Sequence, residues 1–522
     1  MKQRIGTRRW LTAACLAATI LAVQPASVHA EQRHAAAPPP SAPTTTAASG
    51  SGEHSVTPAQ RARMASEEPL VKAALRIRTA AKAAKAPGFA GVALRDGTVT
   101  VYWKGPVPPS SRKTIDQESA KVPVVVRPAA HSAEELGRAA DEIRRKLAAS
   151  GDRSVVSIGY PVTGSGITAT VTGAKTPAAL ANTPVPVTLA RTTPKATKPA
   201  TSASGSGRTD APAAPGTART SGTGGSMGAL AFGDWPNPSR QDDAVPAWGG
   251  AHLINSEATG GNEGWQVRDD ETGKVVRADD KWHCTSGFPA IFKGTGQELM
   301  VQPLSCGGPQ RQFVDASGDP VNVKSTSIGV VASSGVSLTV PVGGAEPFLY
   351  DGDPWTQVGW QISDWAEPVA GQSVCVSAAE LGSFCDATIG DEVGTESALI
   401  QTSQGDSNLT QNMTNLGTHY EDGPVHPARR PYVLADGSVC NTFDFMDNTD
   451  CSQFAFAPGD MGAAVYTVPA DGDDTGVTIR GLLVHQHDGY LQNPTNFHII
   501  GADQIFAAYP DITLLTSRND RP

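Results

Sequence analysis

The residues in this sequence that could carry chemistry are first of all its cysteines. Six of the seven lie in the C-terminal half and fall into three well-separated local pairs: Cys284 and Cys306, Cys375 and Cys385, Cys440 and Cys451. An even number of cysteines in an exported protein indicates disulfides. A zinc site would typically have about two to four residues between its cysteines, and none of these pairs is so close. We therefore expect three disulfides, and neither a metal nor a cofactor.

A second candidate for chemistry is the sequence His485-Gln486-His487-Asp488. On a strand, alternate residues share one face, which would suit two-point metal binding or acid–base work. No third ligand is identifiable, so we favour a solvated loop with surface histidines. The run from Asp471 to Asp474 is interpreted as an exposed turn, with calcium binding as the alternative, and Asn408 and Asn412 begin glycosylation sequons.

The N-terminus indicates export. A charged stretch precedes an apolar run of 14 residues, Trp10 to Val23, and the small-residue sequence Val28-His29-Ala30 follows. This order is typical of a secretory signal peptide over residues 1–30. The run is too short for a bilayer span, which takes about 20 residues. The adjacent Arg8 and Arg9 also suit a twin-arginine signal, so the export route stays open.

The mature chain is expected to be acidic. The formal net charge of the 522 residues is -9, and removing residues 1–30 takes away four basic residues and no acidic one, which leaves -13. Such a surface disfavours nucleic acid and anionic membranes as partners. No later segment is apolar enough for a membrane helix, so we expect a secreted, extracellular protein whose oligomeric state the sequence leaves open.

The elements that must position these residues fall into two predicted domains. Residues 31–56 have the composition of a disordered segment. Residues 57–173 are predicted to form a small α+β domain, which contains a β-hairpin turning at Asp96-Gly97 and a helix that starts with a Ser132/Glu135 capping box. The predicted elements of this domain are helices over 57–86 and 132–149, a hairpin over 88–105, and strands over 124–126, 155–160 and 167–171.

The remainder of the chain is expected to be a linker and an all-β domain. Residues 174–229 are rich in Thr, Pro, Ala, Ser and Gly, as is typical of a flexible linker. Over residues 230–516, short alternating apolar runs recur between turn residues, and helical periodicity is absent until Gly501–Tyr509. Many short strands with turn signals indicate a β-sandwich or barrel.

Four passages of this second domain resemble the streptogrisin-type branch of the trypsin-like serine peptidases. The passages are Cys284-Thr-Ser-Gly-Phe with Leu304-Ser305-Cys306, Gly371-Gln-Ser-Val-Cys375 through Cys385, Pro458-Gly459-Asp460-Met461-Gly462, and Ile479 to Val484. The resemblance implies an all-β double β-barrel, with Cys284 bonded to Cys306 and Cys375 to Cys385. Cys440 and Cys451 are then expected to pair locally. Residues 57–173 resemble the prodomains of such enzymes.

The same resemblance assigns substituted residues to all three catalytic roles. The family's histidine precedes the second cysteine of the first pair, and here that residue is Ser305. The nucleophile position is Met461, and the best counterpart of the carboxylate is Gly335. Catalysis needs a hydroxyl, an imidazole to take its proton and a carboxylate to hold the imidazole. At the histidine position, the Ser305 hydroxyl cannot take that proton near neutral pH, and at the nucleophile position, the Met461 thioether has no proton to lose.

Other family positions depart as well. The oxyanion hole would use the backbone amides of Gly459 and Met461, and the bulky Met461 side chain would project into the substrate's space. The pocket position is Ala455, which suggests an uncharged or filled pocket, and Ala457 stands where the family often has a cysteine. These departures indicate coordinated loss around one cleft.

Three hypotheses follow. The first is an inactive peptidase homologue, which binds an extracellular peptide or protein such as a live peptidase. The second is an active secreted hydrolase that uses other residues, with His283 as a candidate base. The third is that the second domain is a stable spacer. An inactive enzyme cannot release its own prodomain, so we also predict that residues 57–173 stay attached unless another peptidase cuts the linker.

Overall fold

The computed structural model describes residues 56–192 apart from 153, and residues 239–517 apart from several segments. These segments are 258–265, 269–274, 279–281, 308–310, 326–334, 354–355, 381, 403–404, 419–431, 434–438, 441–457, 470–475 and 485–495. The predicted signal peptide, Cys451, Ala455, Ala457, the Asp471–Asp474 turn and the His485–Asp488 cluster all lie outside the described residues. All described residues belong to one compact unit, Ser51–Pro522.

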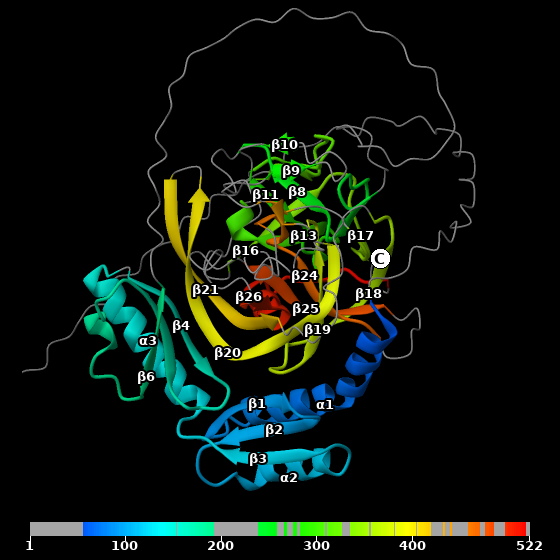
Figure 1. Ribbon diagram of the computed structural model, residues 1–522. Helices are drawn as coiled ribbons and strands as arrows, with labels where there is room; N and C mark the ends of the chain where they lie inside the picture. The colour runs from blue at the N-terminus through cyan, green and yellow to red at the C-terminus, as the bar shows by residue number, and fades with distance from the viewer. Residues whose placement is uncertain are drawn as a thin grey trace, which may run out of the picture. The chain divides into compact units, whose positions relative to one another are not determined.

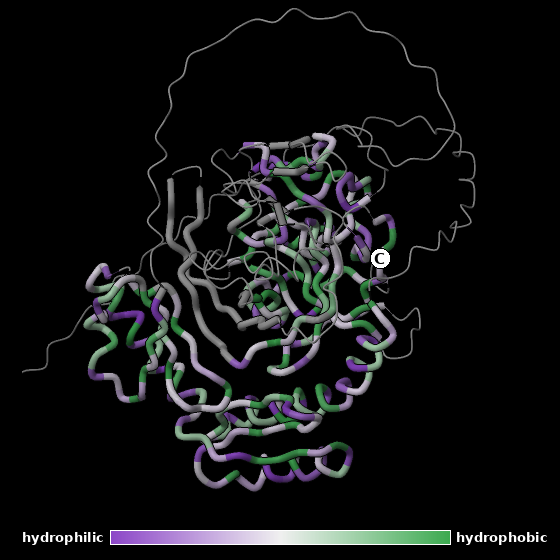
Figure 2. The backbone as a smooth tube through the Cα atoms, in the orientation of Figure 1, coloured by the Kyte–Doolittle hydropathy of each residue, from purple (hydrophilic) through white to green (hydrophobic). Residues whose placement is uncertain are grey.

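The N-terminal region begins with the predicted helix, α1 (Pro58–Ala83). It starts where it does because Thr57 caps it: the Thr57 Oγ1 accepts a hydrogen bond from the Gln60 N–H, and the Gln60 Oε1 accepts one from the Thr57 N–H. One helix face is buried against the three-stranded sheet β1 (Phe89–Arg95), β2 (Thr98–Trp103) and β3 (Val124–Pro128). In Figure 2 hydrophobic residues recur along β1 and β2, while α1 alternates between hydrophobic and hydrophilic residues.

The second half of this region also follows the sequence patterns. The helix α3 (Ala133–Ser150) starts at the predicted Ser132/Glu135 capping box and packs its buried face on β4 (Val155–Pro161) and β5 (Ile167–Thr172). The hairpin of β1 and β2 turns at Asp96-Gly97, where both residues have positive φ angles. Both predictions are confirmed. The helix α2 (Pro109–Ser119) was not anticipated in the sequence.

One boundary needs correction. The segment after residue 173 was expected to be linker, but the structure has a short 3-10 helix, Ala178–Leu180, and the strand β6 (Val187–Thr192). The strand pairs in parallel with β5, and Leu180 and Val185 are buried in the core beneath α3. A few apolar residues in a segment of linker-like composition are enough to cover a sheet, and they hardly change its overall composition.

The C-terminal region is rich in β-strands, as expected. Its strands are β7 (Ala247–Gly249), β8 (His252–Asn255), β9 (Gln266–Arg268), β10 (Val275–Ala278), β11 (Trp282–Thr285), β12 (Phe288–Phe292), β13 (Glu298–Pro303), β14 (Phe313–Val314), β15 (Asn322–Val323), β16 (Val336–Pro341), β17 (Ala345–Tyr350), β18 (Gly359–Trp365), β19 (Ser373–Ala378), β20 (Gly382–Thr402), β21 (Gly405–Thr418), β22 (Tyr432–Val433), β23 (Val439–Cys440), β24 (Ala464–Thr467), β25 (Val477–Val484), β26 (Asn496–Gly501) and β27 (Ile512–Leu514). The helix α4 (Ala502–Ala508) lies within the range where helical periodicity was noted.

These strands form several sheets, whose buried side chains make one main apolar core and smaller clusters beside it. A five-stranded sheet has the order β15-β16-β13-β12-β27, and a three-stranded sheet has the order β11-β8-β14. In the longest sheet, antiparallel pairings run from β19 through β20, β21, β26, β25 and β24 and return to β19. Side chains from both sheet systems, among them Phe288, Leu338 and Leu482, share the main core.

Hydrogen bonds also join the N-terminal region to the C-terminal strands within this compact unit. The strand β4 pairs with β20, and the Leu94 N–H donates to the carbonyl of Ala370 over 2.7 Å. The Glu67 carboxylate accepts from both the N–H and the hydroxyl of Ser373, each over 2.8 Å. No described helix is both long and apolar enough to cross a membrane.

Candidate functional site

The strand β11 organises the candidate site because its neighbouring residues point to opposite faces. In its antiparallel register with β8, Cys284 lies opposite Leu253, and Thr285 lies opposite His252. Side chains alternate along a strand. One face of this pair therefore presents Cys284 and Leu253, while the other presents His283, Thr285 and His252.

The first face belongs to an apolar cluster. We use this name for Leu253, Cys284, Cys306, Phe313 and Met461, whose side chains are all buried. Met461 is 5% exposed, so its thioether is packed among these neighbours rather than presented to solvent. The predicted nucleophile position is thus filled by a buried apolar side chain.

Two predicted disulfides are confirmed. Cys284 is bonded to Cys306, and Cys375 is bonded to Cys385. The first links β11 to the short 3-10 helix Leu304–Cys306, which carries the backbone of Ser305. The predicted third pair, Cys440 with Cys451, stays a prediction because Cys451 lies outside the described residues.

The three positions assigned to the catalytic triad have neighbouring backbones. The Leu304 N–H, one residue before Ser305, donates to the carbonyl of Gly335 over 2.9 Å. Sγ of Cys306, one residue after Ser305, lies 3.8 Å from the backbone oxygen of Met461. The chain therefore brings the backbones around Ser305, Gly335 and Met461 together, although the role assigned to each remains a prediction.

The turn that carries Met461 is held to β11 by the hydroxyl and the backbone of Thr285. The Thr285 N–H donates to the Met461 carbonyl, and its Oγ1 donates to the Gly459 carbonyl, each over 2.8 Å. The same Oγ1 accepts from the Ala379 N–H over 3.0 Å. Asp460, which is fully buried, accepts from the Glu380 N–H over 2.8 Å. Thr285 therefore joins the Gly459–Met461 turn to the segment that follows β19.

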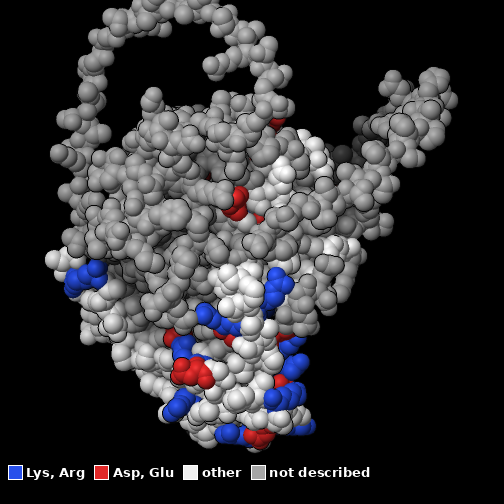
Figure 3. All heavy atoms as spheres, turned by 45° about the vertical axis from the view of Figure 1, so that its right-hand side comes forward, with Lys and Arg blue, Asp and Glu red and all other residues white. Residues whose placement is uncertain are grey.

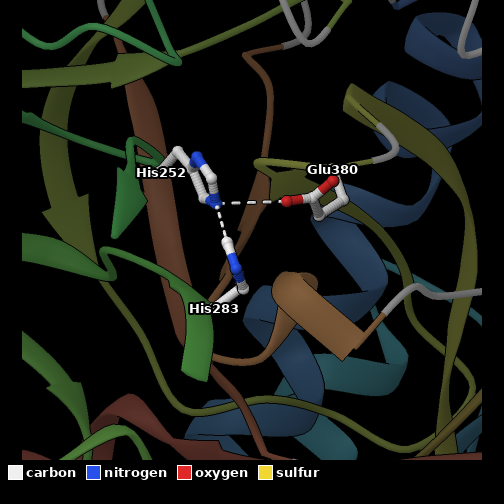
Figure 4. A group of neighbouring side chains, drawn as sticks. All are labelled: His252, His283 and Glu380. Carbon is white, nitrogen blue, oxygen red and sulfur yellow. Dashed lines mark hydrogen bonds and ion pairs between the residues drawn. The ribbon is translucent and has the colours of Figure 1, made fainter. Parts of the chain in front are cut away.

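The second face of β11 belongs to a polar cluster, His252, His283 and Glu380 (Figure 4). Nε2 of His252 lies 3.0 Å from Nδ1 of His283 and 3.1 Å from Oε1 of Glu380. The histidines are 1% and 0% exposed, and the Glu380 side chain is 9% exposed. Two imidazoles and a carboxylate in this arrangement can share a proton or hold a metal ion.

This cluster was not predicted from the sequence. His283 was a candidate base, but His252 and Glu380 were not among the predicted site residues, and no metal was expected. The three residues come from three separate segments, and only the pairing of β8 with β11 and the position of the loop after β19 bring them together. Because His252, His283 and Glu380 are far apart in the sequence, no local spacing of residues predicts that their side chains meet.

Further ionisable groups are buried near the Gly459–Met461 turn. Arg240 is completely buried, and its guanidinium donates to the Ala378 carbonyl and to the Ser383 hydroxyl. Burial lowers the pKa of Arg240, while the nearby carboxylates of Asp351 and Asp460 act in the opposite direction. Burial likewise raises the pKa of Tyr466, whose hydroxyl lies 3.1 Å from Asp351. The negative charges of Asp351 and Asp460 therefore offset part of the cost of burying the Arg240 guanidinium.

The described surface mixes both signs of charge. On the face drawn in Figure 3, the described Lys and Arg side chains lie among Asp and Glu side chains. Ion pairs in the N-terminal region include Arg76 with Glu118 at 3.1 Å and Lys121 with Glu118 at 2.8 Å. No extended basic patch is present on the described part of that face.

Comparisons with known proteins gave matches only among solved structures. No protein-family model and no curated protein matches the sequence. A glutamic acid-specific serine protease aligns at 13% identity and a TM-score of 0.28, over 51% of this chain and all of its own. Thermobifida fusca protease A aligns at 14% identity and a TM-score of 0.27, over 45% of this chain and 92% of its own, and a Nocardiopsis protease at 13% and 0.26, over 45% and 93%. With TM-scores this low, the trypsin-like resemblance still depends on the sequence motifs.

Proposed function

We propose that this chain is a secreted, catalytically inactive homologue of the trypsin-like serine peptidases, which acts by binding an extracellular peptide or protein. The observation that carries the proposal is the burial of Met461 in the apolar cluster. A thioether has no proton to lose and cannot form an acyl ester with a substrate. Packed among Cys284, Cys306 and Phe313, it also leaves no space for a reacting carbonyl at that place.

The positions next to Met461 support the same proposal. Ser305, where the family has its histidine, carries a hydroxyl, which cannot serve as a general base near neutral pH. Gly335, the counterpart of the carboxylate, has no side chain to orient an imidazole. Even one missing triad member leaves only the residual catalysis of binding and oxyanion stabilisation.

A carboxylate beside Gly459 weakens the residual catalysis as well. A Cβ atom built on Gly459 would lie 2.5 Å from Cγ and 2.8 Å from Oε1 of Glu380, so the two residues are in close contact. Oxyanion stabilisation requires donors and positive potential where negative charge develops. As long as no cation is bound to it, a carboxylate at this place opposes that charge. We therefore propose that the region around Gly459 does not act as an oxyanion hole.

We further propose the double β-barrel as the architecture of the C-terminal region. The cyclic pairing of β19, β20, β21, β26, β25 and β24 supports one of its two halves. The sheet β15-β16-β13-β12-β27, with β11 and β8 nearby in sequence, supplies the strands for the other. Secretion is supported by the two disulfides, because cystines persist mainly in oxidising compartments.

A fluorophosphonate probe tests the loss of catalysis. The purified full chain is incubated with the probe at neutral pH beside trypsin as the active control, then denatured and resolved on a gel. We expect no covalent label on this chain and complete labelling of trypsin. Labelling that survives denaturation, or casein cleavage that disappears in a His283→Gln variant, would show an active hydrolase instead.

Binding is tested separately. A displayed random-peptide library is panned against the immobilised full chain, and enriched peptides are resynthesised with a fluorophore for anisotropy titration. We expect a saturable interaction with an enriched consensus sequence. Absence of enrichment, together with no binding of active secreted peptidases, would favour the view that the domain is a spacer.

The proposal also bears on the N-terminal region. An inactive chain cannot cut its own linker, so residues 57–173 are expected to stay attached. Mass spectrometry of the secreted protein checks it. An N-terminus near Glu31 agrees with the proposal, whereas one near residue 230 contradicts it, unless a protease-deficient host restores the longer form.

A further inference from the structure

We propose that the polar cluster of His252, His283 and Glu380 is a binding site for one divalent transition-metal ion of the zinc class. The site is independent of the substituted triad, since none of its residues occupies a triad position. The inference comes from the convergence of the three side chains, from their donor types and from their burial.

The geometry is that of a ligand set. Figure 4 shows Nε2 of His252 facing both the His283 ring and the Glu380 carboxylate, so this atom is shared by both interactions. The three potential ligand atoms all lie within 4.8 Å of one another. Ligands around a tetrahedral zinc ion, at about 2.0–2.1 Å from it, lie about 3.4 Å apart. The observed separations of 3.0 and 3.1 Å from Nε2 need only small adjustments to admit an ion.

Hydrogen bonds alone fit this arrangement less well than an ion does. A ring nitrogen holds at most one proton, yet Nε2 of His252 has two partners at hydrogen-bond distance, Nδ1 of His283 and Oε1 of Glu380. A proton on Nε2 can be directed well at only one of them. Without that proton, Nε2 and an ionised carboxylate would present lone pairs to each other. A cation at the centre attracts all three lone pairs at once.

The donor set selects the class of metal. Two imidazole nitrogens and one carboxylate oxygen suit zinc and its neighbours in the first transition row, whereas magnesium and calcium prefer oxygen ligands alone. Cysteine ligands do not compete here, because Cys284, beside His283, is bonded to Cys306. A set of three protein ligands leaves a fourth coordination position for water or for another group.

The surroundings indicate what the ion would do. His252 lies on β8, His283 on β11, and Glu380 just after β19, where its N–H donates to the buried Asp460. Glu380 also contacts Gly459. An ion held by the three side chains would therefore tie two strands and the loop after β19 to the Gly459–Met461 turn. We assign it a stabilising role at the edge of the former catalytic cleft.

Direct metal analysis tests the proposal on the full-length chain. The protein is stripped with a chelator, incubated with zinc or magnesium chloride, desalted and measured by inductively coupled plasma mass spectrometry. We expect one zinc and no magnesium per chain. We expect His283→Gln and Glu380→Gln to lower zinc affinity by about a hundred-fold or more, since loss of an outer-shell partner alone costs about 10- to 100-fold.

Two matched controls locate the site. His131→Gln removes a histidine in the N-terminal region and should leave zinc binding unchanged. The double variant His485→Gln/His487→Gln removes the other histidine pair that the sequence offers, and it should also retain one zinc. If this double variant loses the ion while His283→Gln keeps it, the proposal is wrong.

A cobalt readout does not depend on the folding of any variant. Cobalt(II) added to the stripped wild-type chain should give the visible absorption bands of a four-coordinate site with nitrogen and oxygen ligands, and zinc should displace it at one equivalent. Absence of these bands, together with no zinc retained by the wild type, would mean that the cluster is a hydrogen-bonded chain only.

Discussion

The two faces of β11 carry clusters of opposite chemistry, one residue apart in the sequence. Cys284 faces the apolar cluster with Met461, and His283 faces the polar cluster with Glu380. On the first face, the Met461 thioether is buried among apolar neighbours. On the second, ionisable groups remain buried and contact one another. Neighbouring residues of one strand can therefore serve an apolar cluster on one side and a buried polar cluster on the other, because side chains alternate along a strand.

The turn Gly459–Met461 connects the two clusters. Its Met461 side chain belongs to the apolar cluster, while Gly459 contacts Glu380 of the polar cluster. Thr285 holds the turn from the β11 side through the carbonyls of both residues. Variants at each of these places therefore separate the contribution of packing from that of polar contacts.

The largest effect is expected from the disulfide in the apolar cluster. The variant Cys284→Ala/Cys306→Ala should lower the free energy of unfolding by about 3–5 kcal/mol, because the bond closes a loop with a sequence separation of 22 and its sulfurs are buried. Guanidinium unfolding followed by tryptophan fluorescence measures this.

The shorter cystine provides the matched comparison. Cys375→Ala/Cys385→Ala opens a loop with a sequence separation of only 10, and chain entropy predicts a loss smaller by about 0.7 kcal/mol. Equal losses would indicate that packing of the sulfurs, rather than loop closure, dominates both bonds.

Truncation of Met461 should have the next largest effect. Met461→Ala leaves a cavity among buried neighbours and should cost about 2–3 kcal/mol, at the lower end for a buried methionine because the cluster is small. Met461→Leu conserves volume and should cost less than about 1.5 kcal/mol. The two variants are compared by guanidinium unfolding. A Met461→Ala variant as stable as the wild type would show that the side chain is not packed.

Thr285 tests the connection between the clusters. Thr285→Val keeps the shape but removes the hydroxyl, which leaves the Gly459 carbonyl and the Ala379 N–H without this partner, at a cost of about 2 kcal/mol. Thr285→Ser keeps the hydroxyl and serves as the control in the same unfolding assay. If the serine variant loses as much stability as the valine variant, the methyl group matters more than the hydrogen bonds.

The smallest effect on stability, with the clearest effect on the polar cluster, is expected at Gly459. An alanine Cβ there would lie 2.5 Å from Cγ of Glu380, so this buried side chain must shift, and Gly459→Ala should cost about 1 kcal/mol. The same shift should move Oε1 away from His252 and lower zinc affinity by about ten-fold. Isothermal titration with zinc measures this, and unchanged affinity would separate the turn from the polar cluster.

Local signals in the sequence predicted much of the architecture. The capping residues Thr57 and Ser132 begin their helices, and Asp96-Gly97 turns the hairpin, because each depends on contacts within a few residues. The two cystines followed from the motifs around them. The strand β6 was missed because its few apolar residues stand in a segment with the composition of a linker.

By itself, the sequence determined what two residue types can do wherever they lie: the Met461 thioether has no proton to lose, and the Ser305 hydroxyl cannot serve as a general base near neutral pH. It also determined that the C-terminal region is rich in strands, because alternation is a local property. Only the tertiary structure decided that Met461 packs with Cys284 and that His252, His283 and Glu380 meet. Strand pairing and loop placement between distant segments create those contacts, and no spacing along the chain encodes them.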